Sequence, residues 1–143
     1  MIRIFLDANV YFSASRSKSG ASAAILELAK SKQLCVFATS TVLREAERNI
    51  RLKEPQNTRL RFYEIVKECK AKLITIDKRQ AEKRYLKLIN RKDTYVLEGA
   101  RKANVGYLLT LDKKHFMNTK IKTAVFPFKI LGPGQLIRTL ASK

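Results

Sequence analysis

Short apolar runs rich in β-branched residues alternate along the chain with longer segments whose apolar residues recur every three to four positions. The short runs predict strands at residues 2–6, 34–38, 73–76 and 107–111, with a weaker strand at 124–131. The longer segments predict helices at residues 21–32, 41–52, 58–70, 78–89 and 94–103. Because the strand runs lack polar alternation, each strand is expected to be covered on both faces. Residues 1–143 are therefore predicted to form a single domain, a Rossmann-like three-layer α/β/α sandwich with a mainly parallel central sheet of four to five strands.

Two prolines qualify the C-terminal part of this pattern. Pro127 interrupts the weak strand, which suits an edge strand or a bulge because proline cannot donate to a sheet ladder. Pro133, followed by Gly134, is placed where a helix start tolerates proline, so a short terminal helix is predicted to run to Leu140.

The charge of the chain narrows the choice of partner. Thirty Lys and Arg residues stand against 12 Asp and Glu, for a net charge of +18. This excess is larger than solubility requires, and a positive field of this strength concentrates polyanions, which makes nucleic acid the leading candidate. An anionic membrane surface or an acidic protein would satisfy the same charge.

The remaining composition indicates a soluble cytoplasmic protein with no membrane partner. Cys35 and Cys69 are 34 positions apart and form neither a CxxC motif nor a disulfide framework, so free thiols are expected. One histidine, His115, leaves too few soft ligands for a structural zinc site. The N-terminus reaches Asp7 before the apolar region of a signal peptide could form, and no apolar run approaches the ~20 residues that cross a bilayer.

Two acids stand at the ends of predicted strands. Asp7 directly follows the first strand, and Asp112 directly follows the fourth. Ligands of open α/β sheets bind in the crevice beyond the carboxyl ends of the strands, so both carboxylates can point into it. Capping of the next helix or turn is the alternative role for each, and position alone does not choose between the two.

Two further acids are candidates on predicted helices. Asp93 falls within the apolar stripe of its helix, where an inward carboxylate needs a cation, a proton or hydrogen bonds to offset its desolvation. A metal ion would satisfy it, and so would the backbone N–H groups of a helix that Asp93 caps. On residues 41–52, Glu45 and Glu47 flank the apolar stripe on opposite sides, and the helical wheel cannot choose between them.

Four motifs carry the candidate acids in order along the chain: Asp7-Ala8-Asn9-Val10, Thr39-Ser40-Thr41-Val42-Leu43-Arg44-Glu45, Lys92-Asp93-Thr94-Tyr95-Val96-Leu97-Glu98-Gly99-Ala100 and Leu109-Thr110-Leu111-Asp112-Lys113-Lys114-His115-Phe116. Together they resemble the PIN domain family, toxins of the VapC type included. The family has an acid after strand one, a glutamate on the second helix, and an acid that opens a later helix before a final Thr-x-Asp strand end. Residues 130–137 are similar to its terminal strand–proline–helix.

The resemblance implies that Asp7, Glu45, Asp93 and Asp112 are both the metal ligands and the catalytic residues. It selects Glu45 over Glu47, because the family's glutamate follows a Val-Leu-x step. Asp77 also ends a predicted strand, but the family pattern has no essential acid there, so we interpret it as the cap of the helix that begins at residue 78.

The chain departs from the family at two positions. Many relatives carry acids where Lys92 and His115 stand here. Both changes reduce negative charge near the ion. His115 is a candidate for contact with substrate or leaving group, or else a plain surface histidine beside Lys113 and Lys114.

Carboxylate oxygens without His or Cys suit Mg²⁺ or Mn²⁺ over zinc. The resemblance implies hydrolysis of RNA phosphodiester bonds, leaving 5′-phosphate and 3′-hydroxyl ends. Supporting roles are expected for Asn9, which would position a ligand or water, and for Thr110, which would support Asp112.

Basic residues near the acids are the candidates for contacts to the RNA backbone. We expect this role for Arg44, Arg48, Arg51, Lys113 and Lys114. A second basic helix carries Arg79, Lys83, Arg84, Lys87, Arg91 and Lys92, although solvated helix faces often have such a pattern. Tyr11, Phe12 and Tyr95 are candidates for base stacking or, as is commoner for aromatics, for core packing.

Two functions remain open at the level of sequence. The first is an endoribonuclease, as a toxin whose basic cleft is masked by an acidic antitoxin-like protein. The second is a PIN-fold nucleic-acid-binding module that has weak or no catalysis, an alternative kept open by Lys92 and His115. The resemblance also implies a homodimer, because dimers are common in the family.

Overall fold

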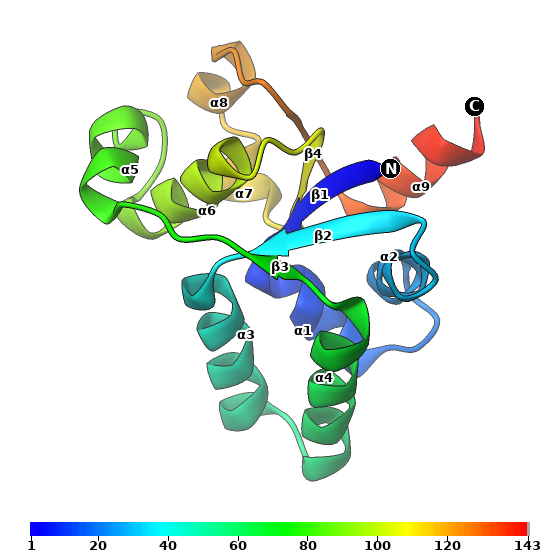
Figure 1. The fold of residues 1–143 in the computed structure, drawn as a ribbon. Helices are drawn as coiled ribbons and strands as arrows, with labels where there is room; N and C mark the ends of the chain where they lie inside the picture. Colours follow the sequence, from blue (N-terminus) through cyan, green and yellow to red (C-terminus); the bar gives the residue numbers. More distant parts are fainter. Residues whose placement is uncertain (143) are drawn as a thin grey trace.

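A computed structural model describes residues 1–142, in which five parallel strands form one sheet between layers of helices (Figure 1). The strand order across the sheet is β3-β2-β1-β4-β5. The strands are β1 (Ile2–Leu6), β2 (Leu34–Ala38), β3 (Lys72–Leu73), β4 (Tyr107–Leu109) and β5 (Lys129–Leu131). The predicted fold class, an α/β/α sandwich with a parallel central sheet, is confirmed.

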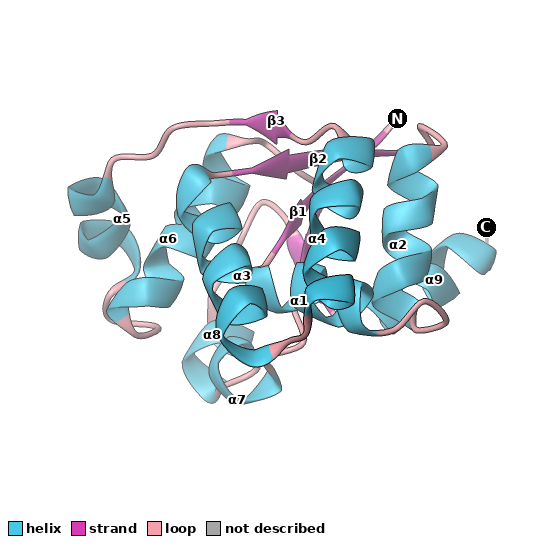
Figure 2. Ribbon diagram, turned by 90° about the horizontal axis from the view of Figure 1, so that it is seen from below, coloured by secondary structure: helices cyan, strands magenta, loops and turns pink. Residues whose placement is uncertain are grey.

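The helices alternate with the strands along the chain. They are α1 (Ala8–Arg16), α2 (Ala21–Lys30), α3 (Ser40–Lys53), α4 (Gln56–Cys69), α5 (Lys78–Tyr85), α6 (Arg91–Lys102), α7 (Lys113–Phe116), α8 (Thr119–Thr123) and α9 (Pro133–Ala141). α1, α3 and α4 lie on one face of the sheet and α6 on the other, and the view in Figure 2 shows α2, α3 and α4 in front of the strands. Within residues 1–142, no helix combines the length and the apolar character that crossing a membrane requires.

Three strands are shorter than the sequence predicted. β3 covers only Lys72–Leu73, because the chain makes one more bond, from Ile74 N to Ala38 O, and then leaves the sheet. β4 ends at Leu109 instead of 111, and the weak strand at 124–131 forms only over Lys129–Leu131. β5 lies at the sheet edge, as predicted, but it begins after Pro127, so this proline is not part of the strand.

The helix predictions fail mainly by omission. α1, α7 and α8 were not predicted, whereas the helix from Pro133 is confirmed and runs to Ala141. The helix predicted at 94–103 begins earlier, at Arg91, because Asn90 caps it by accepting a hydrogen bond from Asp93 N at 3.1 Å.

The central strand sets the distance between the sheet and α6. Phe5 in β1 is fully buried, and a Cβ added at Gly99 of α6 would lie 2.6 Å from Cζ of its ring. Only a residue without a side chain allows α6 to approach β1 so closely. This contact also fixes where the N-terminal end of α6 lies relative to the end of β1.

The order in which the chain adds strands to the sheet reverses direction between β1 and β4. From β1 the chain proceeds outward to β2 and β3, whereas β4 and β5 lie on the other side of β1. In parallel α/β sheets such a switch point leaves a crevice beyond the carboxyl ends of the two strands. The residues that follow β1 and β4 therefore meet at this edge.

Candidate active site

One pocket at this edge of the sheet is lined by all four predicted acids. Asp7 follows β1, Glu45 lies on α3, Asp93 in the first turn of α6, and Asp112 between β4 and α7. The full lining is Asp7, Ala8, Asn9, Phe12, Glu45, Asn49, Lys53, Lys92, Asp93 and Asp112. Four separate elements thus bring the acids together.

Asp7 is held by its neighbours on both strands. Its carboxylate accepts hydrogen bonds from Ala8 N (2.8 Å), from the Thr110 hydroxyl (2.8 Å) and from Asn9 Nδ2 (3.2 Å). Asn9 in turn accepts from Leu111 N at 3.0 Å. Asn9 and Thr110 therefore tie the ends of β1 and β4 together around Asp7.

Asp112 is the N-cap of α7, a helix absent from the sequence prediction. Its Oδ1 accepts from His115 N at 3.0 Å, and its Oδ2 lies 2.7 Å from His115 Nδ1. Thr110 Oγ1 accepts from Asp112 N at 3.1 Å, so Thr110 contacts both strand-end acids. For Asp7 and Asp112, the capping contact and the position in the pocket occur together: the two interpretations do not exclude each other.

Asp93 is not the cap of its helix, so the capping role considered as an alternative to metal binding is wrong. Asn90 holds the N-cap position, and its Nδ2 donates to Asp93 Oδ2 at 2.7 Å. Asp93 is only 9% exposed, and within residues 1–142 no hydrogen bond reaches its second oxygen, Oδ1. A largely buried carboxylate whose second oxygen has no donor is a position where a cation is energetically favoured.

The two glutamates of α3 point to different surroundings. Glu45 lines the pocket and forms an ion pair with Lys92. Glu47 accepts a hydrogen bond from the Tyr63 hydroxyl of α4 at 3.0 Å and pairs with Arg51 at 3.6 Å. Asp77, as predicted, caps α5 by accepting from Arg79 N and Gln80 N.

Burial and mutual repulsion act on the pocket acids. Burial raises the pKa of Asp7, and the nearby carboxylates of Asp93 and Asp112 raise it further, against hydrogen bonds from Thr110 and Ala8 that lower it. Burial likewise raises the pKa of Asp93, with a further contribution from Asp112. Clustered acids with raised pKa values are typical of functional sites, because a folded protein gains no stability from them.

Glu98, a buried acid outside the pocket, behaves in the opposite way. Its carboxylate binds Arg101 Nη2 at 2.9 Å and Arg84 Nε at 3.1 Å. The hydrogen bond from Arg101, with the charges of both guanidinium groups, lowers the pKa of Glu98. Glu98 thus joins α5 to α6 as a structural ion pair, whereas Asp7 and Asp93 form no ion pair within residues 1–142.

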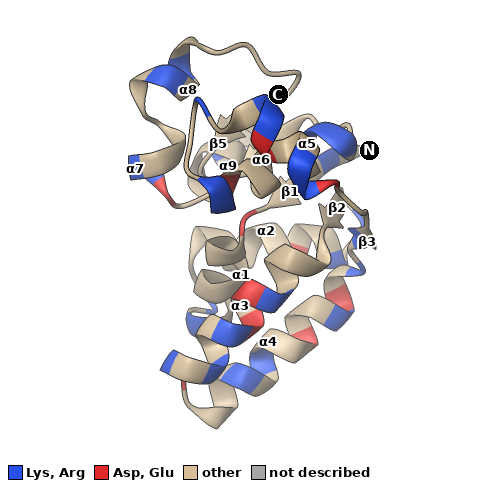
Figure 3. Cartoon of the chain, turned by 90° about the vertical axis from the view of Figure 1, so that its left-hand side faces the viewer, with Lys and Arg blue, Asp and Glu red and all other residues tan. Residues whose placement is uncertain are grey.

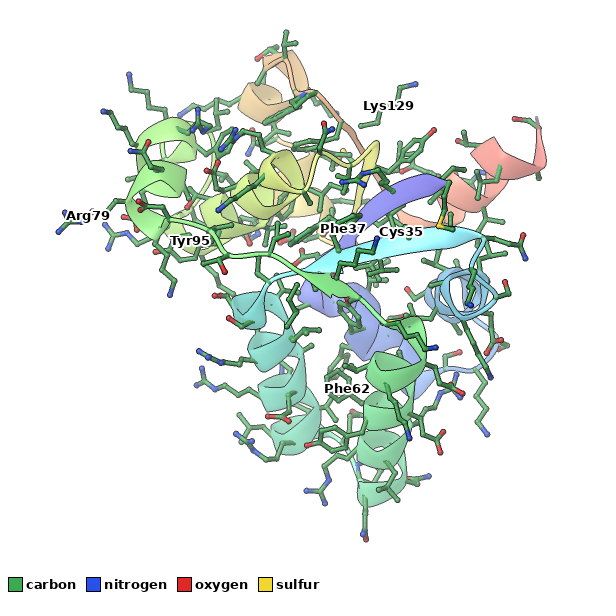
Figure 4. All side chains as sticks on the ribbon, viewed as in Figure 1. Cys35, Phe37, Phe62, Arg79, Tyr95 and Lys129 are labelled. Atoms are coloured by element: carbon green, nitrogen blue, oxygen red, sulfur yellow. The ribbon has the colours of Figure 1, made fainter. Side chains whose placement is uncertain are left out.

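The predicted RNA-contacting residues lie outside the pocket lining. Arg44, Arg48 and Arg51 are exposed on α3, and Lys113 and Lys114 are exposed on α7. Figure 3 shows basic residues spread along α3, α4, α5 and α8. In the second basic segment, Arg84, Arg91 and Lys92 each pair with a glutamate, while Arg79 projects outward from α5 (Figure 4).

Two polar pocket residues, Asn49 and Lys53, were missed as site residues. Asn49 and Lys53 follow Glu45 at intervals of four on α3, so helical spacing alone could have placed them on its face. Phe12 lines the pocket from α1, and Arg16 Cζ lies 5.6 Å from its ring centre. Phe12, one of the three aromatic candidates for base stacking or core packing, therefore lies at the pocket, although the helix that carries it was not predicted.

The other aromatic and cysteine candidates lie elsewhere. Tyr11 is fully buried, so it packs in the core and cannot stack on a base. Tyr95 lies near α5, where its hydroxyl donates to Glu82 at 2.7 Å (Figure 4). Cys35 and Cys69 are free thiols, as predicted, with Cys69 buried and Cys35 half-buried.

Comparison with known proteins agrees with this architecture. The model of the PIN domain family matches residues 3–114. Among solved structures, the chain is similar to the crystal structure of VapBC2 from Rickettsia felis bound to a DNA fragment from its promoter, with a TM-score of 0.63 and 16% identity over 90% of this chain and 97% of that one. At this identity the likeness shows the fold alone. Among curated proteins, none matches this sequence.

Proposed function

This chain belongs to the PIN domain family, a family of generally metal-dependent nucleases, and we propose that residues 1–143 form one nuclease domain that hydrolyses RNA. In this proposal Asp7, Glu45, Asp93 and Asp112 hold a Mg²⁺ or Mn²⁺ ion and are the catalytic residues. The products would be 5′-phosphate and 3′-hydroxyl ends.

The observation that carries the proposal is the convergence of these acids in one pocket at the switch point of the sheet. The pKa of Asp7 is raised by burial and by the carboxylates of Asp93 and Asp112, so the three acids are close enough to repel one another. Such a cluster is destabilising without a cation, which supports an ion as its natural occupant.

The donor set fits a hard divalent ion. Carboxylate oxygens from four elements line the pocket, and Asp93 Oδ1 accepts no hydrogen bond from residues 1–142. When bound, such an ion stabilises negative charge on a phosphate and lowers the pKa of water.

The chain's own residues perform the remaining tasks. Thr110 and Asn9 orient the Asp7 carboxylate through hydrogen bonds of 2.8 and 3.2 Å. Lys53 and Lys92 supply positive charge at the pocket wall, where a phosphate could be held against the acids. We propose that Arg44, Arg48, Arg51, Lys113 and Lys114 guide the RNA backbone toward the pocket, since all are exposed on helices that border it.

The proposal predicts that purified protein cleaves labelled RNA, that chelation stops cleavage and that Mn²⁺ restores it. Asp7→Asn and Asp112→Asn are each expected to lower the cleavage rate by about 10²-fold or more, because each removes a ligand charge. Gel separation of the labelled products measures the rate, and filter binding measures whether the variants still bind RNA.

Asp77→Asn is the matched control. Asp77 is also a helix-capping aspartate, but it does not line the pocket, so its variant should cleave at the wild-type rate. If both pocket variants cleave as wild type does, the catalytic assignment is wrong. Wild-type protein that binds RNA without cleaving it would favour the nucleic-acid-binding module, for which the Lys92–Glu45 ion pair is the specific observation.

A toxin role is the finer proposal. The solved structure of similar fold is a VapBC2 assembly bound to promoter DNA. The net charge of +18 on this chain would attract an acidic antitoxin-like protein to the same surface that attracts RNA. An acidic partner that inhibits the cleavage assay would separate a toxin from a free-standing nuclease.

A further inference from the structure

One side chain near the pocket has a metal-binding chemistry that differs from that of the four acids. A carboxylate oxygen of Asp93, a carboxylate oxygen of Asp112 and a ring nitrogen of His115 all lie within 4.8 Å of one another. Small side-chain rotations would bring all three atoms to about 2.0–2.2 Å from one shared ion, the length of the bonds that metal ions make with nitrogen and oxygen ligands.

The contacts of these three residues leave ligand atoms available. Asp93 is 9% exposed, lines the pocket and uses only Oδ2 in a hydrogen bond, to Asn90. His115 Nδ1 and Asp112 Oδ2 lie 2.7 Å apart, so a divalent ion bound to both atoms would take the place of this contact. Asp112 Oδ1 stays committed to His115 N, which keeps the α7 turn in place while the other atoms bind.

We infer that His115 is a metal ligand with Asp93 and Asp112, so that the site is a mixed nitrogen–oxygen centre that favours Mn²⁺ over Mg²⁺. The inference rests on the proposed function, whose ion it specifies further. Mn²⁺ binds an imidazole less strongly than the later first-row ions do, but it accepts one, whereas Mg²⁺ prefers an all-oxygen shell. One carboxylate exchanged for an imidazole therefore changes the selectivity of the site as well as its charge.

Lys92 also favours Mn²⁺ over Mg²⁺ at this site. Its ammonium group pairs with Glu45, so this carboxylate already has a cation beside it in the described structure. Fewer free carboxylate charges weaken the binding of a hard ion that depends mainly on charge. Nitrogen ligation by His115 would offset that loss for Mn²⁺ but not for Mg²⁺.

The chain offers an unusually direct spectroscopic test, because it contains a single histidine. In untagged protein, pulsed electron paramagnetic resonance of bound Mn²⁺ is expected to detect one directly coordinated imidazole nitrogen. His115→Gln should abolish that signal. The His115 side chain is 47% exposed, so the substitution leaves the core intact, and circular dichroism checks the fold.

Calorimetric titration with Mn²⁺ and with Mg²⁺ provides the second measurement. His115→Gln is expected to weaken Mn²⁺ binding by about tenfold or more while leaving Mg²⁺ binding nearly unchanged. His115→Asp, which exchanges nitrogen for oxygen, should strengthen Mg²⁺ binding and so reduce the preference for Mn²⁺.

The possible failures are distinguishable. Absence of nitrogen coupling, with an unchanged Mn²⁺ to Mg²⁺ affinity ratio in both variants, would overturn the inference and leave metal-dependent cleavage standing. In that case His115 only contacts Asp112. If wild-type protein binds neither ion, both the inference and the proposed metal site are wrong.

Discussion

At the scale of single residues, Asp93 is a pocket residue whose carboxylate lowers the stability of the metal-free protein. Its backbone N–H and its Oδ2 atom are both bonded to Asn90, yet no hydrogen bond from residues 1–142 reaches its Oδ1, although the residue is only 9% exposed. Burial and the charge of Asp112 raise its pKa above the ordinary value of 3.8. Ionised Asp93 therefore destabilises the metal-free fold.

Asp93→Asn is expected to stabilise the protein in the presence of a chelator, by about 0.5–1 kcal/mol at neutral pH. The asparagine oxygen can still accept from Asn90, while the buried charge is removed. Because the folded-state pKa of Asp93 is raised, wild type loses stability as pH rises from 3.8 through that pKa. The difference in the free energy of unfolding between Asp93→Asn and wild type should consequently be largest at neutral pH and decrease as the pH falls toward 3.8. Urea unfolding measures this difference.

In saturating Mn²⁺, wild type should become more stable than Asp93→Asn, because the ion stabilises only the protein that binds it. A variant that is less stable than wild type in chelator at neutral pH would contradict this account of Asp93.

Sequence reasoning at this scale could identify the acids but not their surroundings. Burial of Asp93 followed from its place in an apolar stripe, whereas its cap, Asn90, was missed because the helix was predicted to begin at 94. The choice of Glu45 over Glu47 depended on the family pattern, since both glutamates flank the stripe equally. That Lys92 would pair with Glu45 depends on how α6 approaches α3, which no local pattern contains.

At the scale of elements, the packing of α6 on β1 sets the geometry of the pocket. β1 carries Asp7 at its end, and α6 carries Asp93 in its first turn. The two elements are in close contact at Gly99, where a Cβ would meet Phe5 Cζ at 2.6 Å and Cε2 at 2.8 Å.

Gly99→Ala is expected to destabilise the fold by about 1 kcal/mol and to weaken Mn²⁺ binding. Overpacking typically costs about 1–3 kcal/mol, of which the better helix propensity of alanine recovers up to about 1 kcal/mol. The methyl group would push α6 away from β1 and so separate Asp93 from Asp7. Thermal unfolding and calorimetric titration measure the two effects.

Gly106→Ala is the matched control. A Cβ at Gly106 would have no neighbour closer than Arg3 O at 3.9 Å, so neither stability nor metal binding should fall. Equal behaviour of the two variants would show that close approach at Gly99 does not position the pocket.

The elements that could be predicted are those whose pattern is local. β1 and β2 match their predicted bounds, because a short run of apolar residues, interrupted in β1 only by Arg3, is recognised without knowledge of its partner strands. α1 escaped prediction because Val10, Tyr11 and Phe12 are weak helix formers; its helix depends on capping by Asp7 and on packing against α2, α3 and α4. β3 is short because it is an edge strand with a single neighbour, β2.

At the scale of the whole molecule, a strongly basic chain surrounds an acidic pocket. The sign of the charge, 30 Lys and Arg against 12 Asp and Glu, could be read from the sequence. The convergence of all four acids was expected only from the family resemblance, because it depends on the strand order that places β4 beside β1. The basic surface therefore attracts a polyanion, and the acidic pocket attracts a divalent cation.

The most direct test of this account is an anomalous difference map from a crystal of the untagged protein soaked in Mn²⁺. The account predicts one strong peak in this pocket, within bonding distance of carboxylate oxygens of Asp7, Glu45, Asp93 and Asp112. A well-occupied Mn²⁺ elsewhere, or no peak in this pocket at millimolar Mn²⁺, would contradict it.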